Sequence, residues 1–401
     1  MSAAGAGNGI LSGLRVLDCA TVLAGPLIAT LLGDFGADVI KVEHPNGDPL
    51  REMGPKKDGA SLWWKAVGRN KRSVVLYLRS EFGRRAFEAL VPTADVLIEN
   101  FRPGTFEKWG YGPDRLTALN ERLILVRVTG FGQTGPYRDR PGFGTLVEAM
   151  SGYANLTGFA DGPPILPPLG LADSVAALNG VIGILLALES RRTSGRGQTI
   201  DLALYEPLFS FLAAYVIYYD QLASLQPRMG NRTATSRLRN AYQAGNGKWL
   251  VLSGATPKAA ESVLIAIGAP SELIADTVAG RSERALDEAD AFMARWVKER
   301  SREEALEFLQ RVDAPAIAIY DMKDIFEDPQ YAARASSVAV PDAELGAVRM
   351  PNVFPRLGGD PGKIRWTGPP LGDATISVLC DELGFSREEV ARNCKPARER
   401  L

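Results

Sequence analysis

The sequence holds few of the residues on which many active sites are built, with one histidine, His44, and three cysteines among 401 residues. A Ser–His–Asp or Cys–His nucleophile would have to use that one imidazole. A zinc site with two or three imidazole ligands cannot form within one chain, and we expect no metal. The cysteines are scattered and odd in number, which argues against a disulfide framework and is typical of a reducing compartment. We therefore expect any acid, base or nucleophile to be a carboxylate, Lys, Tyr or Cys.

Neither sign of charge is in excess, since 46 Lys and Arg face 47 Asp and Glu, a net charge of −1. No global positive field is present to gather nucleic acid or an anionic membrane. The longest apolar runs, Val175–Leu188 and Leu208–Tyr219, fall short of the roughly 18 residues of a membrane span. Residues 1–10 lack the basic and apolar regions of a secretory signal. We expect a cytoplasmic protein with no nucleic acid and no membrane as partner.

The first half of the chain alternates short β-rich runs with helical patterns. This alternation predicts βαβ units, a mostly parallel sheet and a large Rossmann-like α/β domain, with ligands at the carboxyl ends of the strands. Helices are expected from Gly25 to Leu32 and over Glu81–Val91. The expected strands are Arg15–Asp18, Ala37–Val42, Ser73–Leu78, Asp95–Glu99 and Leu123–Val128.

The second half predicts two apolar helices, Ser174–Arg191 and Leu208–Leu222, and then a hairpin over Gln243–Ser253 that turns at Gly245–Gly247. Two charged helices, Ser282–Arg300 and Arg302–Arg311, follow. We predict four parts: a disordered tail at 1–10, the large α/β domain at 11–226, a smaller α/β domain at 227–330, and at 331–401 a linker with a C-terminal return to the large domain.

Asp173 lies directly before the apolar run Ser174–Leu178, after a segment without charge, Pro163–Leu171. An Asp in this place predicts an N-cap, whose carboxylate accepts backbone N–H bonds at the positive end of the helix. The same place allows a second interpretation. An ionised carboxylate in an apolar surrounding is poorly solvated and can act as an oxygen nucleophile. Position alone leaves both interpretations open.

Three further motifs allow a binding role and a plain structural one. Glu99–Gly104 follows a strand and offers amides and one cation to a phosphate, or it is a strand-to-helix turn. Gly130–Pro136 has the glycine spacing of a phosphate loop but lacks the Lys-Ser/Thr of a Walker loop and runs into a proline. Asn70–Ser73 is a small basic cluster, which is more often surface charge than a site.

Taken in order, these segments resemble the class III CoA-transferases, a family that includes formyl-CoA transferase and carnitine CoA-transferase. The resemblance extends along nearly the whole chain. The segments that carry it are Leu14–Asp18 with Ala24–Pro26, Gly36–Glu43 with Gly47–Asp48, Asn70–Ser73, Glu99–Gly104, Gly130–Tyr137, Asp173, Pro370–Gly372 and Leu383–Ser386.

The resemblance implies a mechanism that needs no histidine. Asp173 would attack an acyl-CoA to give a mixed anhydride and then an aspartyl-CoA thioester, which the acceptor carboxylate attacks in turn. Coenzyme A would act as a substrate, with no tightly bound cofactor. Backbone amides of Gly245–Gly247 would bind the oxyanions. Family members form an interlocked homodimer of ring-shaped subunits, so this chain is expected to pair with itself.

The resemblance also implies the coenzyme A contacts. His44 stands where formyl-CoA transferase has an arginine, and its imidazole either stacks on adenine or belongs to a surface loop. The other expected contacts are Leu23, Ala24, Leu76, Arg79, Asn100, Phe101, Arg102, Lys108 and Arg140.

Two other functions exist within the same superfamily. Racemases of α-methylacyl-CoA use a His-Asp pair, and here Phe143 and Gly144 occupy those places. A catalytically silent CoA-binding homologue would have lost its nucleophile, whereas Asp173 is present.

The basic segment 226–239 indicates the substrate. The segment contains Arg232, Arg237 and Arg239 and no Asp or Glu. We hypothesise that one of these arginines, Arg232 or Arg239, holds the distal carboxylate of a dicarboxylic acid, beside the loop of Gly245 and Gly247. Succinyl-CoA is then the expected donor. Alternatively, these arginines are solvated or pair with acids.

Overall fold

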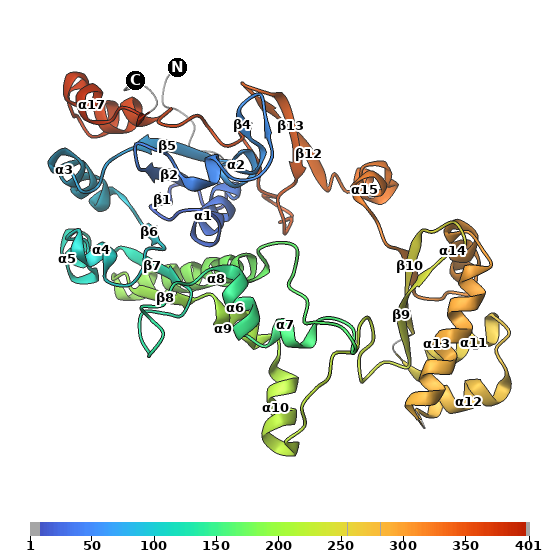
Figure 1. The fold of residues 1–401 in the computed structure, drawn as a ribbon. Coiled ribbons are helices and arrows are strands. Elements are labelled where there is room, and N and C mark those ends of the chain that lie inside the picture. Colours follow the sequence, from blue (N-terminus) through green and yellow to red (C-terminus); the bar gives the residue numbers. More distant parts are fainter. Residues whose placement is uncertain (1–8, 255, 281, 398–401) are drawn as a thin grey trace. The chain divides into compact units, whose positions relative to one another are not determined.

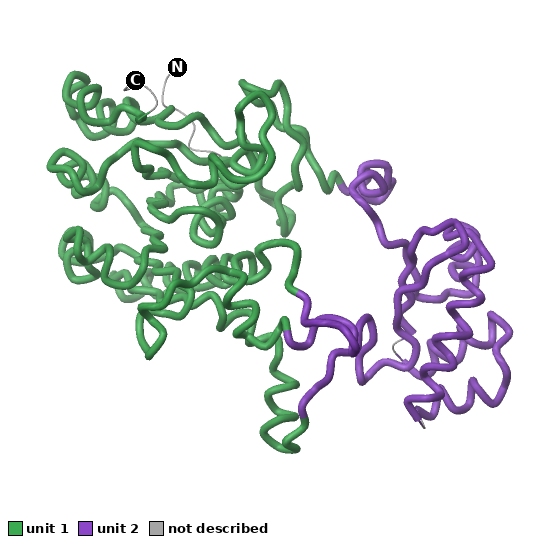
Figure 2. Tube along the Cα trace, viewed as in Figure 1, with its two compact units in different colours: residues 1–154, 166–224, 335–401 green, residues 155–165, 225–334 purple. Residues whose placement is uncertain are grey.

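The computed structural model describes residues 9–254, 256–280 and 282–397. The chain divides into two compact units (Figure 2). The first contains residues 1–154, 166–224 and 335–401, and the second contains 155–165 and 225–334. Of the predicted tail at 1–10, residues 1–8 lie outside the described part. Gly9 accepts a hydrogen bond from the Ser12 N–H at 2.8 Å, in the turn that leads into the first strand.

A parallel sheet of six strands forms the centre of the first unit (Figure 1). This confirms the α/β prediction with a mostly parallel sheet. The chain order reverses beside β1, which pairs with β2 on one side and with β6 on the other. Ligands of such sheets bind at the carboxyl ends of the strands near this reversal. From one edge to the other the strands are β5 (Lys71–Val75), β2 (Asp38–Glu43), β1 (Arg15–Asp18), β6 (Val96–Glu99), β7 (Ile124–Thr129) and β8 (Thr199–Ala203).

Helices cover both faces of the sheet, so the inner strands are buried on both sides. Val16 of β1 packs on the side of α1 (Ala24–Asp34) and α8 (Leu171–Ser194). The next residue, Leu17, packs on the side of α3 (Glu81–Leu90). Successive strand residues point to opposite faces, and here each face meets its own apolar core.

The remaining elements of the first unit are short. They are the helices α2 (Leu62–Val67), α4 (Thr105–Lys108), α5 (Pro113–Leu119), α6 (Gly144–Met150), α9 (Tyr205–Ser210), α10 (Ala213–Leu222) and α17 (Arg387–Asn393), the short helical turns η1 (Pro49–Arg51), η2 (Val91–Thr93) and η3 (Ser377–Glu382), and the strand pairs β3 (Lys56–Lys57) and β4 (Ala60–Ser61), and β12 (Ser337–Asp342) and β13 (Gly346–Pro351). The helix α7 (Tyr153–Leu156) spans the boundary between the first and the second unit.

Two expectations about these elements were wrong in detail. The predicted helix Leu208–Leu222 is interrupted between α9 and α10, because Leu212 leaves the helical region with φ −92° and ψ 15°. The predicted strand Ser73–Leu78 ends at Val75. The Leu76 N–H still donates to the Glu43 carbonyl of β2 at 2.8 Å, and the chain from Leu76 to Arg79 lines a cavity.

α8 is longer than its sequence pattern indicated. Among the described residues it is the helix whose length and composition would allow it to cross a membrane, with a mean hydropathy of 1.9 over 18 residues. Ala172, Ala176 and Ile184 on this helix lie in the core between α1 and the sheet. This packing is typical of the core helix of a globular protein.

The second unit contains an antiparallel sheet in the order β11 (Ala316–Ala318), β10 (Trp249–Gly254) and β9 (Leu238–Gln243). The predicted hairpin is thus confirmed, as is the helix α14 at Arg302–Arg311. The other helices are α11 (Pro257–Ala266), α12 (Ser271–Ala279), α13 (Glu283–Lys298), α15 (Met322–Glu327) and α16 (Pro329–Ala333).

Residues 155–165 belong to the second unit through Arg228. Its guanidinium donates hydrogen bonds to the carbonyl oxygens of Asn155, Phe159 and Gly162. The Gly230 N–H also donates to the Gly158 carbonyl at 2.8 Å. A loop distant in sequence is thereby bound to the segment that leads into β9.

Candidate active site

A cavity of about 710 Å³ opens beyond the carboxyl ends of β6 and β7 in the first unit. It brings Asp173 together with Leu23, Ala24, Asn100, Phe101, Arg102 and Arg140 of the predicted site residues. These residues come from separate loops and from the first turns of α1 and α8. The structure therefore collects in one cavity side chains that are far apart in the sequence, from Thr21 to Leu204.

A second cavity of about 460 Å³ lies beside the first, because Thr21 and Phe101 line both. It contains the predicted residues His44, Leu76 and Arg79. The His44 ring meets the Tyr77 ring edge-on, with centroids 5.2 Å apart. Lys108 is exposed at the end of α4 and lines neither cavity, whereas its neighbour Trp109 lines the second.

The predicted N-cap role of Asp173 is wrong. α8 begins at Leu171, two residues earlier than its apolar pattern indicated, so Gly170 is the N-cap and has no side-chain cap bond. Asp173 is the third residue of the helix and so does not occupy the N-cap position. Burial and the negative charge of Glu148 raise the pKa of Asp173 to about 6, against the opposite effect of its own backbone N–H. The anion is therefore poorly stabilised.

Two glycines make room for the Asp173 carboxylate. A Cβ on Gly144, at the start of α6, would overlap Oδ2 of Asp173. A Cβ on Gly170 would lie 3.1 Å from the same oxygen and 2.7 Å from Cδ2 of Leu23. Backbone on both sides thus approaches the carboxylate closely. Sequence reasoning missed this role of the two glycines, since nothing in the sequence indicates which side chain faces them.

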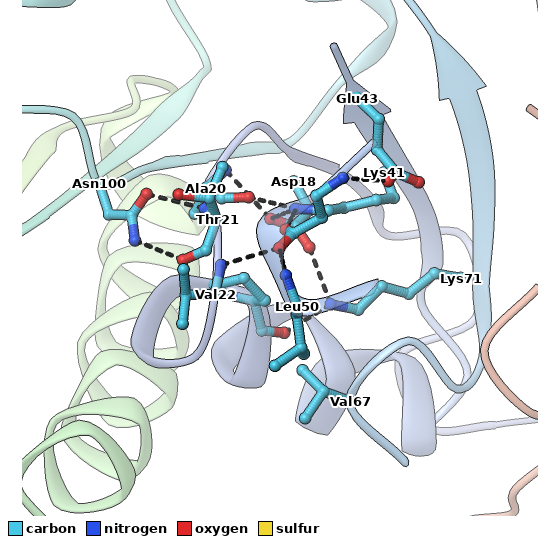
Figure 3. Close-up of polar contacts among 12 residues, drawn as sticks. Asp18, Ala20, Thr21, Val22, Lys41, Glu43, Leu50, Val67, Lys71 and Asn100 are labelled. Carbon is cyan, nitrogen blue, oxygen red and sulfur yellow. Dashed lines mark hydrogen bonds and ion pairs between the residues drawn. The ribbon is translucent and has the colours of Figure 1, made fainter. Parts of the chain in front are cut away.

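A buried ionic cluster supports the loop between β1 and α1 (Figure 3). Asp18 accepts a hydrogen bond from Lys71 at 2.8 Å and lies 3.5 Å from the Lys41 ammonium. Lys41 also donates to the Ala20 carbonyl and pairs with Asp48 at 3.0 Å. Lys71 is fully buried, so the interpretation of Asn70–Ser73 as surface charge was wrong for this residue.

The same loop is held from two further sides. The Val22 N–H donates to Asp48 at 3.1 Å, and Asn100 exchanges two hydrogen bonds of 2.8 Å with the backbone of Thr21 (Figure 3). Val22 has a φ of +67°, a conformation that β-branched residues rarely adopt and that costs of order 1–3 kcal/mol. The cluster and Asn100 together stabilise this strained turn, and the turn presents Leu23 and Ala24 to the cavity.

A second buried ion pair supports the turn after β6. Arg127 binds Glu99 and Glu107 at 2.7 Å each. The other oxygen of Glu99 accepts the Phe101 N–H at 2.8 Å. The turn that carries Phe101 and Arg102 into the cavities is therefore positioned by charged groups beneath it.

The predicted acceptor residues all lie in the second unit, where most of their polar groups are already engaged. Arg232 pairs with Asp287 at 2.6 Å and with Asp290 at 3.4 Å. Arg239 donates to the Asn231 carbonyl at 2.7 Å. The Gly245 N–H donates to the Arg300 carbonyl at 2.7 Å, and the Gly247 N–H donates to the Ala244 carbonyl at 3.0 Å.

Comparison with known proteins gives a consistent result. The model of CoA-transferase family III matches residues 11–375. The succinyl-CoA–L-malate CoA-transferase beta subunit of Chloroflexus aurantiacus is 44% identical over 388 residues, with 95% of this chain and 96% of that protein covered. The succinyl-CoA–D-citramalate CoA-transferase of the same organism is 40% identical over 387 residues, with the same coverage. A CaiB/BaiF family protein from Brucella suis has a similar structure, with a TM-score of 0.83, 31% identity, and 94% of this chain and 100% of that chain covered.

Proposed function

The chain belongs to CoA-transferase family III and is a class III CoA-transferase, and from this premise we propose that it transfers coenzyme A from succinyl-CoA to a dicarboxylic acid. One observation carries the choice of substrates. Arg102, Arg138 and Arg140 line the cavity that contains Asp173, and Asp173 is the one acid among its described lining residues. An excess of cations favours substrates with a second carboxylate. The two similar enzymes from Chloroflexus are named for succinyl-CoA with malate and with citramalate.

In the proposed mechanism Asp173 is the nucleophile. Its carboxylate oxygen attacks the thioester carbonyl carbon, the C–S bond breaks, and CoA thiolate leaves a mixed anhydride. The thiolate then attacks the Asp173 acyl carbon, which releases succinate and forms an aspartyl-CoA thioester. The acceptor carboxylate attacks this thioester and expels the thiolate. Attack of the thiolate on the acceptor acyl carbon then yields the new acyl-CoA and the free Asp173 carboxylate.

These steps need no energy source beyond the thioester. Each step exchanges one activated carbonyl for another, so the overall transfer is close to neutral in free energy. We therefore propose that no ATP, metal ion or tightly bound cofactor takes part, and that coenzyme A enters and leaves as a substrate. A buried anion with a pKa near 6 suits this role, because it is ionised at neutral pH yet poorly stabilised.

We place coenzyme A along the two joined cavities. Its adenosine end would lie in the smaller cavity against His44 and Leu76, with Arg79 as a phosphate contact. The pantetheine chain would pass Phe101, which lines both cavities. The thioester would then reach Asp173 in the larger cavity.

We further propose that the protein is cytoplasmic and forms an interlocked homodimer. Large apolar side chains stay exposed on α8 and α10, at 66% for Leu186 and 72% for Leu222. Exposed apolar faces of this kind mark association surfaces. Leu178, Ile182 and Ile217 belong to the same two helices and are more than half exposed.

A scan of donors and acceptors tests the function. Purified enzyme is incubated with acyl-CoA donors and free acids, and new acyl-CoA species are identified by mass spectrometry. Succinyl-CoA with four- to six-carbon dicarboxylic acids should give the fastest exchange. If formate, carnitine or phenyllactate turn over as well as dicarboxylic acids, the substrate proposal is wrong.

A further inference from the structure

Glu148 is a buried carboxylate on α6 that faces the start of α8. It is 2% exposed, and its Oε1 accepts the Ala172 N–H at 3.1 Å. The first N–H groups of a helix have no partner within the helix, so Glu148 satisfies one of them from outside. In the described part of the chain no Lys or Arg forms an ion pair with Glu148.

Glu148 therefore stabilises the helix start that carries Asp173, one residue after Ala172. Its own negative charge acts on Asp173, and after burial it is the second cause of the raised Asp173 pKa. Two carboxylates in one poorly solvated region disfavour each other's ionised form. Glu148 thus has two effects: it forms a hydrogen bond to the first turn of α8, and its charge destabilises the Asp173 anion.

Other charged groups on the elements packed against α8 have partners of their own. They are Asp34 on α1, bound by Arg69; Arg127 on β7, bound by Glu99; Asp201 on β8, which accepts the Gln133 N–H; Glu206 on α9, bound by the Tyr205 hydroxyl; and Asp95, bound by Arg191 at the far end of α8. The charge of Glu148 acts on Asp173 and contributes to its raised pKa.

We propose that Glu148 is a positioning residue, which orients the first turn of α8 and keeps the Asp173 carboxylate destabilised as an anion and hence reactive. This inference rests on the proposed function. Attack on the thioester carbon converts the Asp173 anion into a neutral anhydride, so the repulsion from Glu148 is relieved as the bond forms. This relief accelerates the chemical step, because the repulsion is present in the ground state and is reduced in the transition state.

The test separates the charge of Glu148 from its hydrogen bond. Glu148→Gln keeps the acceptor oxygen for Ala172 and removes the charge. The rate of aspartyl-CoA formation from succinyl-CoA is measured by intact-protein mass spectrometry between pH 4.5 and about pH 8. The wild type should lose rate as the pH falls through about 6, since protonated Asp173 cannot attack. This fall in rate is the acidic limb of the pH–rate profile. In Glu148→Gln the acidic limb should move to lower pH by about one unit, and the rate at pH 8 should fall a few-fold.

Controls make each outcome decisive. Glu189→Gln removes an exposed charge from α8, the helix that carries Asp173, where Glu189 pairs with Arg192, and should leave the limb in place. Glu148→Asp keeps the charge and should also keep the limb near its wild-type position. If the glutamine variant does not fold, Glu148→Ala removes the same charge and must shift the limb in the same direction.

Failure of this inference differs from failure of the proposed function. Absence of any aspartyl-CoA adduct in the wild type at every pH overturns the proposed function. An adduct that forms with the same pH dependence in the wild type and in Glu148→Gln overturns the role of Glu148 alone. A loss of stability without movement of the limb would likewise reduce Glu148 to a structural residue and contradict the proposal.

Discussion

At the scale of single residues, the residues around Asp173 decide how well its carboxylate anion is stabilised. Its carboxylate lies between Gly144 and Gly170, and Glu148 binds the Ala172 N–H in the first turn of α8. Burial and a like charge keep it from being a well-stabilised anion. Each of these effects can be removed separately by substitution.

Asp173→Asn should abolish CoA exchange, because an amide cannot form the anhydride. Coenzyme A affinity should change by less than a few-fold, since the proposed binding cavity extends well beyond Asp173. Calorimetric titration with CoA and the exchange assay measure the two effects. Retained turnover would refute Asp173 as the nucleophile.

Gly144→Ala should lower the exchange rate by about 100-fold, because its Cβ would overlap Oδ2 of Asp173 and displace the nucleophile. Gly183→Ala on α8 is the matched control, since its Cβ would lie 3.4 Å from the nearest atom, on Ile200. The control should stay active and be slightly more stable, as alanine favours a helix interior. Equal activity of the two variants would contradict the close approach of the Gly144 backbone to the Asp173 carboxylate.

At the scale of elements, charged groups beneath the strand ends position the loops of the site. Asp18 ends β1, Lys41 lies within β2 and Lys71 begins β5, and all three are buried. Lys41 binds the turn before α1 at the Ala20 carbonyl, and Lys71 binds the Pro26 carbonyl in the first turn of α1. Burying charges costs free energy unless they are paired. The cluster is therefore a conformational support for the strained Val22 turn, and it is sensitive to the loss of any member.

Lys71→Met should reduce the free energy of unfolding by about 3–5 kcal/mol, because it removes the ammonium that binds the buried Asp18 carboxylate at 2.8 Å and leaves it with the more distant Lys41, at 3.5 Å. Urea denaturation followed by circular dichroism measures this change. Lys57→Met, at an exposed position of β3, should stay within about 0.5 kcal/mol of the wild type. A similar small effect for Lys71→Met would show that the cluster is dispensable.

At the scale of the whole molecule, α8 and α10 carry exposed apolar faces of the kind that marks association surfaces. We predict that the purified chain sediments as a dimer of the 43.2 kDa subunit. Leu186→Lys introduces a charge at a 66% exposed position and should weaken the dimer, whereas Glu189→Lys on the same helix should not. Sedimentation of the wild type at monomer mass would contradict self-association and favour a different partner chain.

Much of the architecture could be predicted because it depends on local patterns. The alternation of strands and helices was sufficient for the parallel sheet, and the ordered motifs were sufficient for the family. Boundaries that depend on packing could not be predicted. α8 begins at Leu171 rather than after Asp173, and residues 155–165 join the second unit through Arg228, because both are decided by contacts between distant segments.

The sequence by itself determined the family, because the ordered set of motifs extends along nearly the whole chain. The proposal of a carboxylate nucleophile follows from that resemblance and agrees with the single histidine. Only the tertiary structure decided how that carboxylate behaves. The roles of Glu148, Gly144 and the buried Lys71 could not be inferred from the sequence, because their effects arise from burial and from proximity to residues many positions away. A pKa or a steric fit is a property of the assembled surroundings, and these exist only once the chain has folded.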